Sequence, residues 1–218
     1  MPDMPASWTN DFLDLAVRRK ALRFGRFTLK SGRESPYFFN AGAFNDGASL
    51  DQLARCYAGA IVASGLAFDM LFGPAYKGIP LAAAIAISLH RDHGRSVPFA
   101  FDRKEAKDHG EGGLVVGAPL SGRVLIVDDV ISAGTSVQYS RNLIDRSGAQ
   151  ACAVAIALDR QERGRDDRTA VAAVRDEGLD VIAVATLDDL IAWLGRQESG
   201  DVDRSAMLEY RQKYGVDE

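Results

Sequence analysis

A run of four aliphatic residues, Val124 to Val127, leads directly into two adjacent aspartates, Asp128 and Asp129. An unbroken aliphatic run of this kind is typical of a central parallel strand that is covered on both faces. Parallel strands of one sheet need long crossover connections, which are usually helices. The run therefore indicates an open α/β sheet, and it places the two aspartates at the carboxyl edge, where such sheets bind ligands.

The loop that follows the aspartates is built from small residues, and a helix is expected to begin near Thr135. Backbone N–H groups and the positive end of a helix dipole can then face an anion such as a phosphate. Two carboxylates at a turn suit the vicinal hydroxyls of a sugar. An isolated Asp–Asp pair more often caps a turn or a helix. Here the order of strand, acids, small-residue loop and hydroxyl-led helix favours a sugar-phosphate site.

Helical and strand-like segments alternate along most of the chain, with no Pro/Ser-rich linker or repeat between them. This alternation predicts one α/β domain, residues 1–218, with parallel strands joined by helices. Strands are expected at 69–73, 96–101, 123–129, 150–159 and the start of 180–195. Helices are expected after a capping box at Ser49 and Gln52, at 79–92, at 135–148, at the end of 180–195, and around Met207, Tyr210 and Tyr214.

The N-terminal part follows a different pattern. Two short aromatic, extended segments within residues 24–42 flank a Ser-Gly turn. They predict an antiparallel hairpin, at about residues 20–45, which forms a small β hood beside the main sheet.

Composition excludes several functional classes. The formal charge is −4 at pH 7, so the chain offers no basic field for nucleic acid. Two cysteines are too few for a disulfide framework or a metal cluster. No stretch approaches about eighteen uninterrupted apolar residues, and the N-terminus lacks the order of a secretory signal. We therefore expect a cytoplasmic protein without a nucleic-acid or membrane partner.

With these features the chain resembles the type I phosphoribosyltransferases, whose donor is 5-phosphoribosyl 1-diphosphate (PRPP). The resemblance implies a parallel sheet flanked by helices, with a small N-terminal β hood. It implies that Asp128 and Asp129 bind the ribose hydroxyls. The loop that cradles the 5-phosphate would comprise Val130, Ile131, Ser132, Ala133, Gly134, Thr135 and Ser136.

Four further segments resemble the orotate-specific branch of this family. In the first, 27–42, the resemblance implies that Lys30 reaches the ligands and that Phe38 and Phe39 lie by the base. An aromatic contact suits a flat pyrimidine, and an ammonium suits a polyanionic donor. Taken alone, both phenylalanines would be expected to anchor the hairpin in the core.

The second and third segments imply diphosphate contacts. Tyr76 and Lys77 would form a pyrophosphate loop with a cis peptide before Tyr76, although Lys77 alone would be a surface lysine. Residues Arg103–Glu111 contain three cations and three carboxylates, so their charges cancel, which disfavours a nucleic-acid patch. This polar segment suits a mobile catalytic loop at about 103–113. The implied diphosphate ligands are Arg103, Lys104, Lys107 and His109, some of them supplied across a homodimer interface.

The fourth segment contains Arg160, which follows the strand at 150–159. Its planar guanidinium suits a carboxylate, and orotate carries one, so the resemblance implies that Arg160 binds it. An ion pair with Asp159 or Glu162 is the alternative. Many relatives have threonine where this chain has Ser132, which keeps the hydroxyl and loses only a methyl contact.

The implied activity joins N1 of orotate to C1 of the PRPP ribose, giving orotidine 5-monophosphate and pyrophosphate in pyrimidine (UMP) biosynthesis. Catalysis would depend on positioning and charge stabilisation, with His109 or Lys107 as the candidate general acid. Mg²⁺ would bind mainly to donor oxygens. The implied catalytic residues are Lys30, Lys77, Arg103, Lys107, His109, Asp128 and Asp129.

Two other functions share part of this pattern. A purine or uracil phosphoribosyltransferase would share the 124–137 segment. That interpretation does not explain why the hairpin, the 101–117 segment and Arg160 occur together. A catalytically inactive regulatory module that binds PRPP is the alternative from another class. Retention of the basic residues of the implied site disfavours this module.

Overall fold

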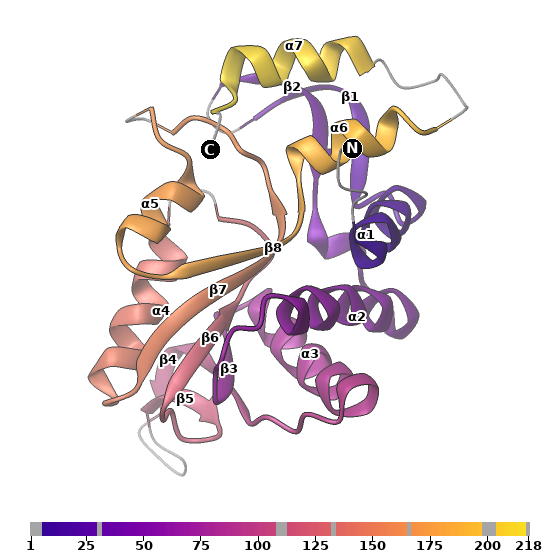
Figure 1. Cartoon of the computed structure of the whole chain (residues 1–218). Coiled ribbons are helices and arrows are strands. Elements are labelled where there is room, and N and C mark those ends of the chain that lie inside the picture. The colour runs from indigo at the N-terminus through magenta and orange to yellow at the C-terminus, as the bar shows by residue number, and fades with distance from the viewer. Residues whose placement is uncertain are drawn as a thin grey trace.

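The centre of the molecule is a six-stranded sheet of order β5-β4-β3-β6-β7-β8 (Figure 1). The computed structural model describes residues 6–29, 32–107, 113–131, 134–164, 167–197 and 204–216, with the backbone alone for 104–107. The strands are β3 (Met70–Gly73), β4 (Phe99–Lys107), β5 (Gly113–Gly117), β6 (Arg123–Val127), β7 (Gln150–Asp159) and β8 (Asp180–Thr186). All run parallel except β5, which pairs antiparallel with β4. The predicted parallel sheet is confirmed.

Helices cover both faces of this sheet (Figure 1). Those on one face are α1 (Ser7–Arg18), α2 (Gly47–Ala63) and α3 (Gly78–His93), and those on the other are α4 (Thr135–Arg146) and α5 (Ala170–Asp176). Successive residues of β6 point to opposite faces, so Leu125 and Val127 join one buried cluster while Val124 and Ile126 join the other. Burial on both faces explains the unbroken aliphatic run.

The hood is a separate two-stranded antiparallel sheet of β1 (Leu22–Thr28) and β2 (Glu34–Phe39), as predicted. After β8, the chain forms α6 (Leu187–Leu194) and then α7 (Arg204–Tyr214), which packs against β2 at the top of Figure 1. Met207 and Tyr210 are buried and Tyr214 packs beside them, so the predicted amphipathic helix is confirmed. Among the described residues, no helix combines the length and apolarity needed to cross a membrane.

Some local predictions were wrong. The helix predicted from Ser49 begins at Gly47, because the side chain of Asp46 accepts the Ser49 N–H and caps the helix earlier. The strand predicted at 96–101 begins at Phe99 and continues to Lys107. Helices α1 and α5 were not predicted. Helix α1 begins after Ala6, which has no capping side chain to mark the start, and α5 has only seven residues.

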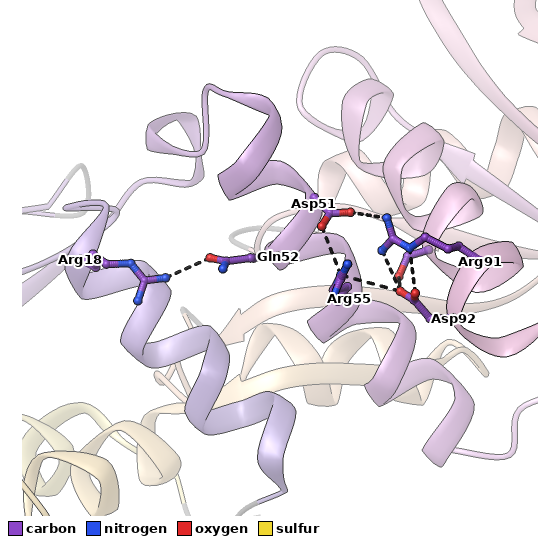
Figure 2. A network of polar contacts seen from close by, with 7 residues as sticks. Arg18, Asp51, Gln52, Arg55, Arg91 and Asp92 are labelled. Atoms are coloured by element: carbon purple, nitrogen blue, oxygen red, sulfur yellow. Dashed lines mark hydrogen bonds and ion pairs between the residues drawn. The ribbon is translucent and has the colours of Figure 1, made fainter.

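A network of ion pairs joins α2 to α3 on their outer surface (Figure 2). Arg91 donates from NH1 to Asp51 Oδ1 (2.6 Å) and from Nε to Asp92 Oδ1 (2.7 Å). The Arg91 guanidinium, with help from the Ser88 hydroxyl, holds the pKa of Asp92 well below its usual value. Exposed pairs of this kind add little stability. We therefore expect the network to fix the alignment of two helices rather than to stabilise the fold.

The turn between β3 and α3 depends on a glycine at each end. A Cβ atom on Gly73 would collide with the carbonyl oxygen of Gly78, and a Cβ atom on Gly78 would lie 2.6 Å from the carbonyl carbon of Gly73. The strand and the helix therefore meet at backbone contact distance. This close approach makes residues 74–77 a tight loop at the carboxyl edge of the sheet.

Replacement of Gly78 by alanine is expected to lower the free energy of unfolding by about 1–3 kcal/mol or more, because the added methyl group overpacks the turn. Gly47→Ala is the matched control, since Gly47 also opens a helix but a Cβ atom there would meet nothing within 4 Å. The control should be neutral or slightly stabilising. Urea unfolding of both variants measures the difference, and equal effects would contradict the close approach.

Candidate functional site

Asp128 and Asp129 lie directly after β6, at the carboxyl edge of the sheet. The N–H of Asp128 donates to the carbonyl of Ala155 (3.0 Å), and the N–H of Ala157 donates to the carbonyl of Asp129 (2.9 Å), so both residues are held by β7. The hydroxyl of the fully buried Tyr57, from α2, donates to the carbonyl of Asp128 (2.7 Å). The turn is therefore fixed from the neighbouring strand and from the helix beneath it.

The two carboxylates have different partners. Asp128 accepts the N–H of Asp129 at Oδ1 (2.9 Å) and the hydroxyl of Ser136 at Oδ2 (3.0 Å). Asp129 Oδ2 lies 2.5 Å from Lys77 Nζ, and the Asp129 side chain is only 9% exposed. Burial raises the pKa of Asp128 to about 6, and the charge of Asp129 adds to the shift. The lysine compensates one of two negative charges that would otherwise repel each other.

The described part of the loop after the acids leads into the N-terminus of α4. Gly134 has φ 70°, a left-handed conformation that glycine adopts without strain. A Cβ atom there would meet nothing within 4 Å, so conformation rather than space requires the glycine. Thr135 and Ser136 are exposed in the first helical turn, where backbone N–H groups have no partner within the helix. This end of α4 is suited to an anion.

The 74–77 loop lies next to the acids. The peptide bond between Ala75 and Tyr76 is cis, as the resemblance implied. The Tyr76 side chain is 66% exposed, and Lys77 reaches across to Asp129. The loop after β3 and the loop after β6 are therefore in direct contact through a charged pair.

Asp102 lies beside this site, although no motif in the sequence marks it. It lies in β4, is 5% exposed, and its Oδ1 accepts the N–H of Ala75 at 2.6 Å. The carboxylate therefore supports the 74–77 loop from the neighbouring strand. The available signal was an acid directly after Phe101, the last residue of the strand predicted at 96–101. Next to it, the Nε atom of Arg103 is buried and has no hydrogen-bond partner among the described residues.

Arg160 follows β7 and faces the hood. Its Nε donates to Glu162 Oε1 (2.8 Å), and its guanidinium carbon lies 4.7 Å from the ring centroid of Tyr37 in β2. The ion pair with Glu162 is the alternative that the sequence left open, and it is present. Because the Nε contact occupies one edge of the guanidinium, it does not by itself prevent the group from binding a ligand.

Phe38 and Phe39 lie on opposite faces of the hood. Phe39 packs against Phe12 of α1, with ring centroids 6.0 Å apart, and this places it in the main core. Phe38 contacts Phe27, with centroids 5.6 Å apart, and the guanidinium of Arg23 lies over its ring at 5.2 Å. The reading as a core anchor holds for Phe39, while Phe38 lies on the other face of the hood and is partly exposed.

The described residues that the structure brings together are Lys77, Asp128, Asp129 and Ser136. Arg160 forms a second group with residues of the hood. The predicted residues Lys30, His109, Ser132 and Ala133 lie outside the described residues, as do the side chains of Lys104 and Lys107. Within the described ranges, no three His, Cys, Asp or Glu side chains gather to hold a metal ion.

The raised pKa of Asp128 predicts a pH-dependent cost to stability. A carboxyl group whose pKa rises from 3.8 to about 6 on folding contributes stability below about pH 4 that is lost as the pH rises through 6. Asp128→Asn should therefore match the parent protein near pH 4 and exceed its free energy of unfolding by about 1–3 kcal/mol at pH 8. Denaturant unfolding across this range measures the gap.

The control for this experiment is Asp145→Asn, which changes an exposed aspartate of α4 that pairs with Arg141 at 3.7 Å. Its effect should be small at both pH values. A parent protein that is more stable than the Asp128→Asn variant at pH 8 would contradict the assigned desolvation.

Comparisons with known proteins agree with this geometry. The family model described as "Phosphoribosyl transferase domain" matches residues 41–187. The orotate phosphoribosyltransferase of Thioalkalivibrio sulfidiphilus is 58% identical over 211 residues, which cover 96% of this chain and 99% of that protein. Among solved structures, the orotate phosphoribosyltransferase of Francisella tularensis has a TM-score of 0.85 at 41% identity, covering 94% of this chain and 99% of that chain.

A more distant structure shows a bound ligand. The orotate phosphoribosyltransferase of Mycobacterium tuberculosis in complex with PRPP has a TM-score of 0.61 at 25% identity, covering 83% of this chain and 98% of that chain. Together with the match over most of the chain to the T. sulfidiphilus protein, these similarities identify the family. The chain belongs to the phosphoribosyltransferases and, within them, to the orotate phosphoribosyltransferase family.

Proposed function

We propose that the chain transfers the 5-phosphoribosyl group of PRPP to N1 of orotate. The products are orotidine 5-monophosphate and pyrophosphate, and the reaction belongs to de novo pyrimidine biosynthesis. The observation that carries this proposal is the contact set of Lys77, Asp129, Asp128 and Ser136 at the carboxyl edge of the sheet. The complex of a relative with PRPP supports it.

Asp128 and Asp129 bind the ribose hydroxyls in this proposal. A carboxylate accepts hydrogen bonds, and with a pKa of about 6 Asp128 is ionised at neutral pH and above. Asp128 also receives the Ser136 hydroxyl, so the ribose contact and the first turn of α4 are linked. The loop of residues 130–136 and the N-terminus of α4 then hold the 5-phosphate.

Bond breaking at C1 of the ribose leaves positive charge on the sugar and negative charge on pyrophosphate. Lys77 and Arg103 neutralise the leaving group in this proposal, together with Lys104, Lys107 and His109. The buried Nε of Arg103 supports this role, because it has no acceptor among the described residues. His109 or Lys107 then protonates the leaving pyrophosphate, and closure of residues 103–113 keeps water from the sugar cation.

The acceptor lies beside the hood in this proposal. Arg160 binds the carboxylate of orotate, Phe38 contacts the pyrimidine ring, and Lys30 reaches both ligands. The position of Arg160 supports the assignment, because the carboxyl ends of β6 and β7 are adjacent and bring it to the same edge of the sheet as Asp128.

We further propose that Mg²⁺ is the metal cofactor. Magnesium on phosphates usually keeps phosphate and water oxygens as ligands and takes few from the protein, so the ion would bind mainly to oxygens of PRPP. The ion would neutralise charge on the diphosphate. Residues of the protein orient the sugar and bind the leaving pyrophosphate in this proposal.

The assembly in this proposal is a cytoplasmic homodimer in which part of residues 103–113 completes the site of the partner subunit. The free thiols of Cys56 and Cys152 suit a reducing compartment, and burial raises the pKa of Cys56 to about 12, so this thiol is unreactive.

The alternative function, an inactive regulatory module, is disfavoured, because this chain retains basic residues that such a module would not need.

The purified protein should consume orotate and release pyrophosphate when PRPP and Mg²⁺ are present. Asp128→Asn,Asp129→Asn should lower kcat/KM by about 10²-fold or more, because the variant no longer holds the ribose as the transition state forms. Orotate absorbance and pyrophosphate release measure the loss, with Asp145→Asn as the active control. A parent protein that binds PRPP but never turns over would instead support the regulatory module.

Mixed dimers test the sharing of sites. An Arg103→Ala chain and an Asp128→Asn,Asp129→Asn chain should each be nearly inactive. Mixing them under conditions of subunit exchange should restore about a quarter of the parent activity. Half of the dimers are then mixed, and each mixed dimer has one intact site out of two. Absence of recovery in verified mixed dimers would show that each chain builds its site alone.

A further inference from the structure

We infer that Glu162 is a positioning residue for Arg160 and that helix α7 is part of the support of the acceptor site. The inference rests on the proposed function, in which Arg160 binds the carboxylate of orotate. It goes beyond that function because it assigns a role to an acid and to a C-terminal helix that lie outside the predicted site.

Glu162 accepts hydrogen bonds from three separate parts of the chain. Its Oε1 accepts the hydroxyl of Tyr210 in α7 (2.8 Å), Nε of Arg160 (2.8 Å) and, at longer range, the hydroxyl of Tyr37 in β2 (3.4 Å). The Glu162 side chain is 15% exposed. A mostly buried carboxylate with this many donors is firmly oriented, and it therefore orients the arginine in turn.

The contacts of Arg160 leave part of its guanidinium for a ligand. Nε is bound by Glu162, and one face of the group lies over the ring of Tyr37 at 4.7 Å. Nη2 lies 2.6 Å from the same oxygen of Glu162 and forms an ion pair with it, but this buried nitrogen has no well-aligned hydrogen bond among the described residues. Buried donors without an acceptor are costly. A ligand carboxylate at the edge formed by Nη1 and Nη2 would accept the N–H of Nη2 that points away from Glu162.

The charge around Glu162 still favours an anionic ligand. Arg33 NH1 lies 3.9 Å from Glu162 Oε2, so the carboxylate faces two guanidinium groups, those of Arg33 and Arg160. These three side chains together carry one excess positive charge. Glu162 can therefore hold Arg160 in place without cancelling its attraction for the carboxylate of the acceptor.

Helix α7 contacts the segment that carries Glu162 through its C-terminal end as well as through Tyr210. The N–H of Arg163 donates to the carbonyl of Tyr214 (2.8 Å), and the N–H of Val216 donates to the carbonyl of Gln161 (3.2 Å). Glu162 and Gly215 form an antiparallel bridge between these two bonds. The segment that carries Glu162 is thus paired along its backbone with the last described residues of the chain.

Steady-state kinetics with orotate and PRPP varied separately test the inference. Glu162→Ala and Tyr210→Phe should raise KM for orotate, by about tenfold or more for the first, while kcat and KM for PRPP change little. Glu162→Gln, which keeps the acceptor oxygen, should rescue part of the loss. Leu208→Ala is the control, because it changes a 47% exposed side chain of the same helix.

A merely structural role predicts another outcome. In that case the thermal midpoint would fall and both KM values would rise together, and this result would overturn the inference. If Glu162→Ala does not fold, Glu162→Gln and Tyr210→Phe decide by the same split between orotate and PRPP. Unchanged KM for orotate in both of them would also overturn it.

Arg160→Ala separates this inference from the proposed function. If Arg160→Ala leaves KM for orotate unchanged, the acceptor role of Arg160 is wrong, and the positioning role of Glu162 falls with it. If Arg160→Ala raises KM for orotate but the Glu162 variants do not, only the positioning role is wrong. In the double variant, the two losses should not add, because the acid acts through the arginine.

Discussion

The ion pair between Lys77 and Asp129 joins two loops that the chain reaches 52 residues apart. It lies where two adjacent carboxylates end a buried strand, a placement that is unfavourable without a cation nearby. The lysine offsets this cost and fixes the loop after β3 against the loop after β6. In the proposed function, ribose and pyrophosphate therefore bind to one connected edge of the sheet.

Holding this edge of the sheet in place lowers the stability of the fold. Gly73 and Gly78 bring β3 and α3 to backbone contact, Asp102 supports the loop between them, and Tyr57 holds the carbonyl of Asp128 from below. The raised pKa of Asp128 shows that its charged form is not favoured by the fold. Such a local conflict is expected at a functional site, where residues are kept for ligand binding and the rest of the structure compensates.

Much of the architecture could be predicted because it follows from local patterns. The aliphatic run before Asp128, the alternation of segments and the paired aromatic stretches of the hood depend on periodicity and turn residues. Helix α1 was missed because Ala6 provides no capping signal, and the helix after Asp46 was started too late because two capping side chains compete within three residues.

The parts of the site that could not be predicted depend on contacts through space. No motif marked Asp102, and Glu162 was only a candidate ion-pair partner of Arg160; their contacts with Ala75 and Tyr210 cross 27 and 48 residues of sequence. Phe38 and Phe39 could not be told apart until the face of each on the hairpin was known. Sequence motifs therefore predicted candidate ligand-binding residues, but not the residues that hold them in place.

A crystal structure of the complex with PRPP and Mg²⁺ would show whether Asp128 and Asp129 hold the ribose of PRPP. Both ribose hydroxyl oxygens are expected within about 3 Å of these carboxylates, with the 5-phosphate at the N-terminus of α4. A sugar bound elsewhere on the protein, with the two carboxylates contacting only protein groups, would contradict this expectation.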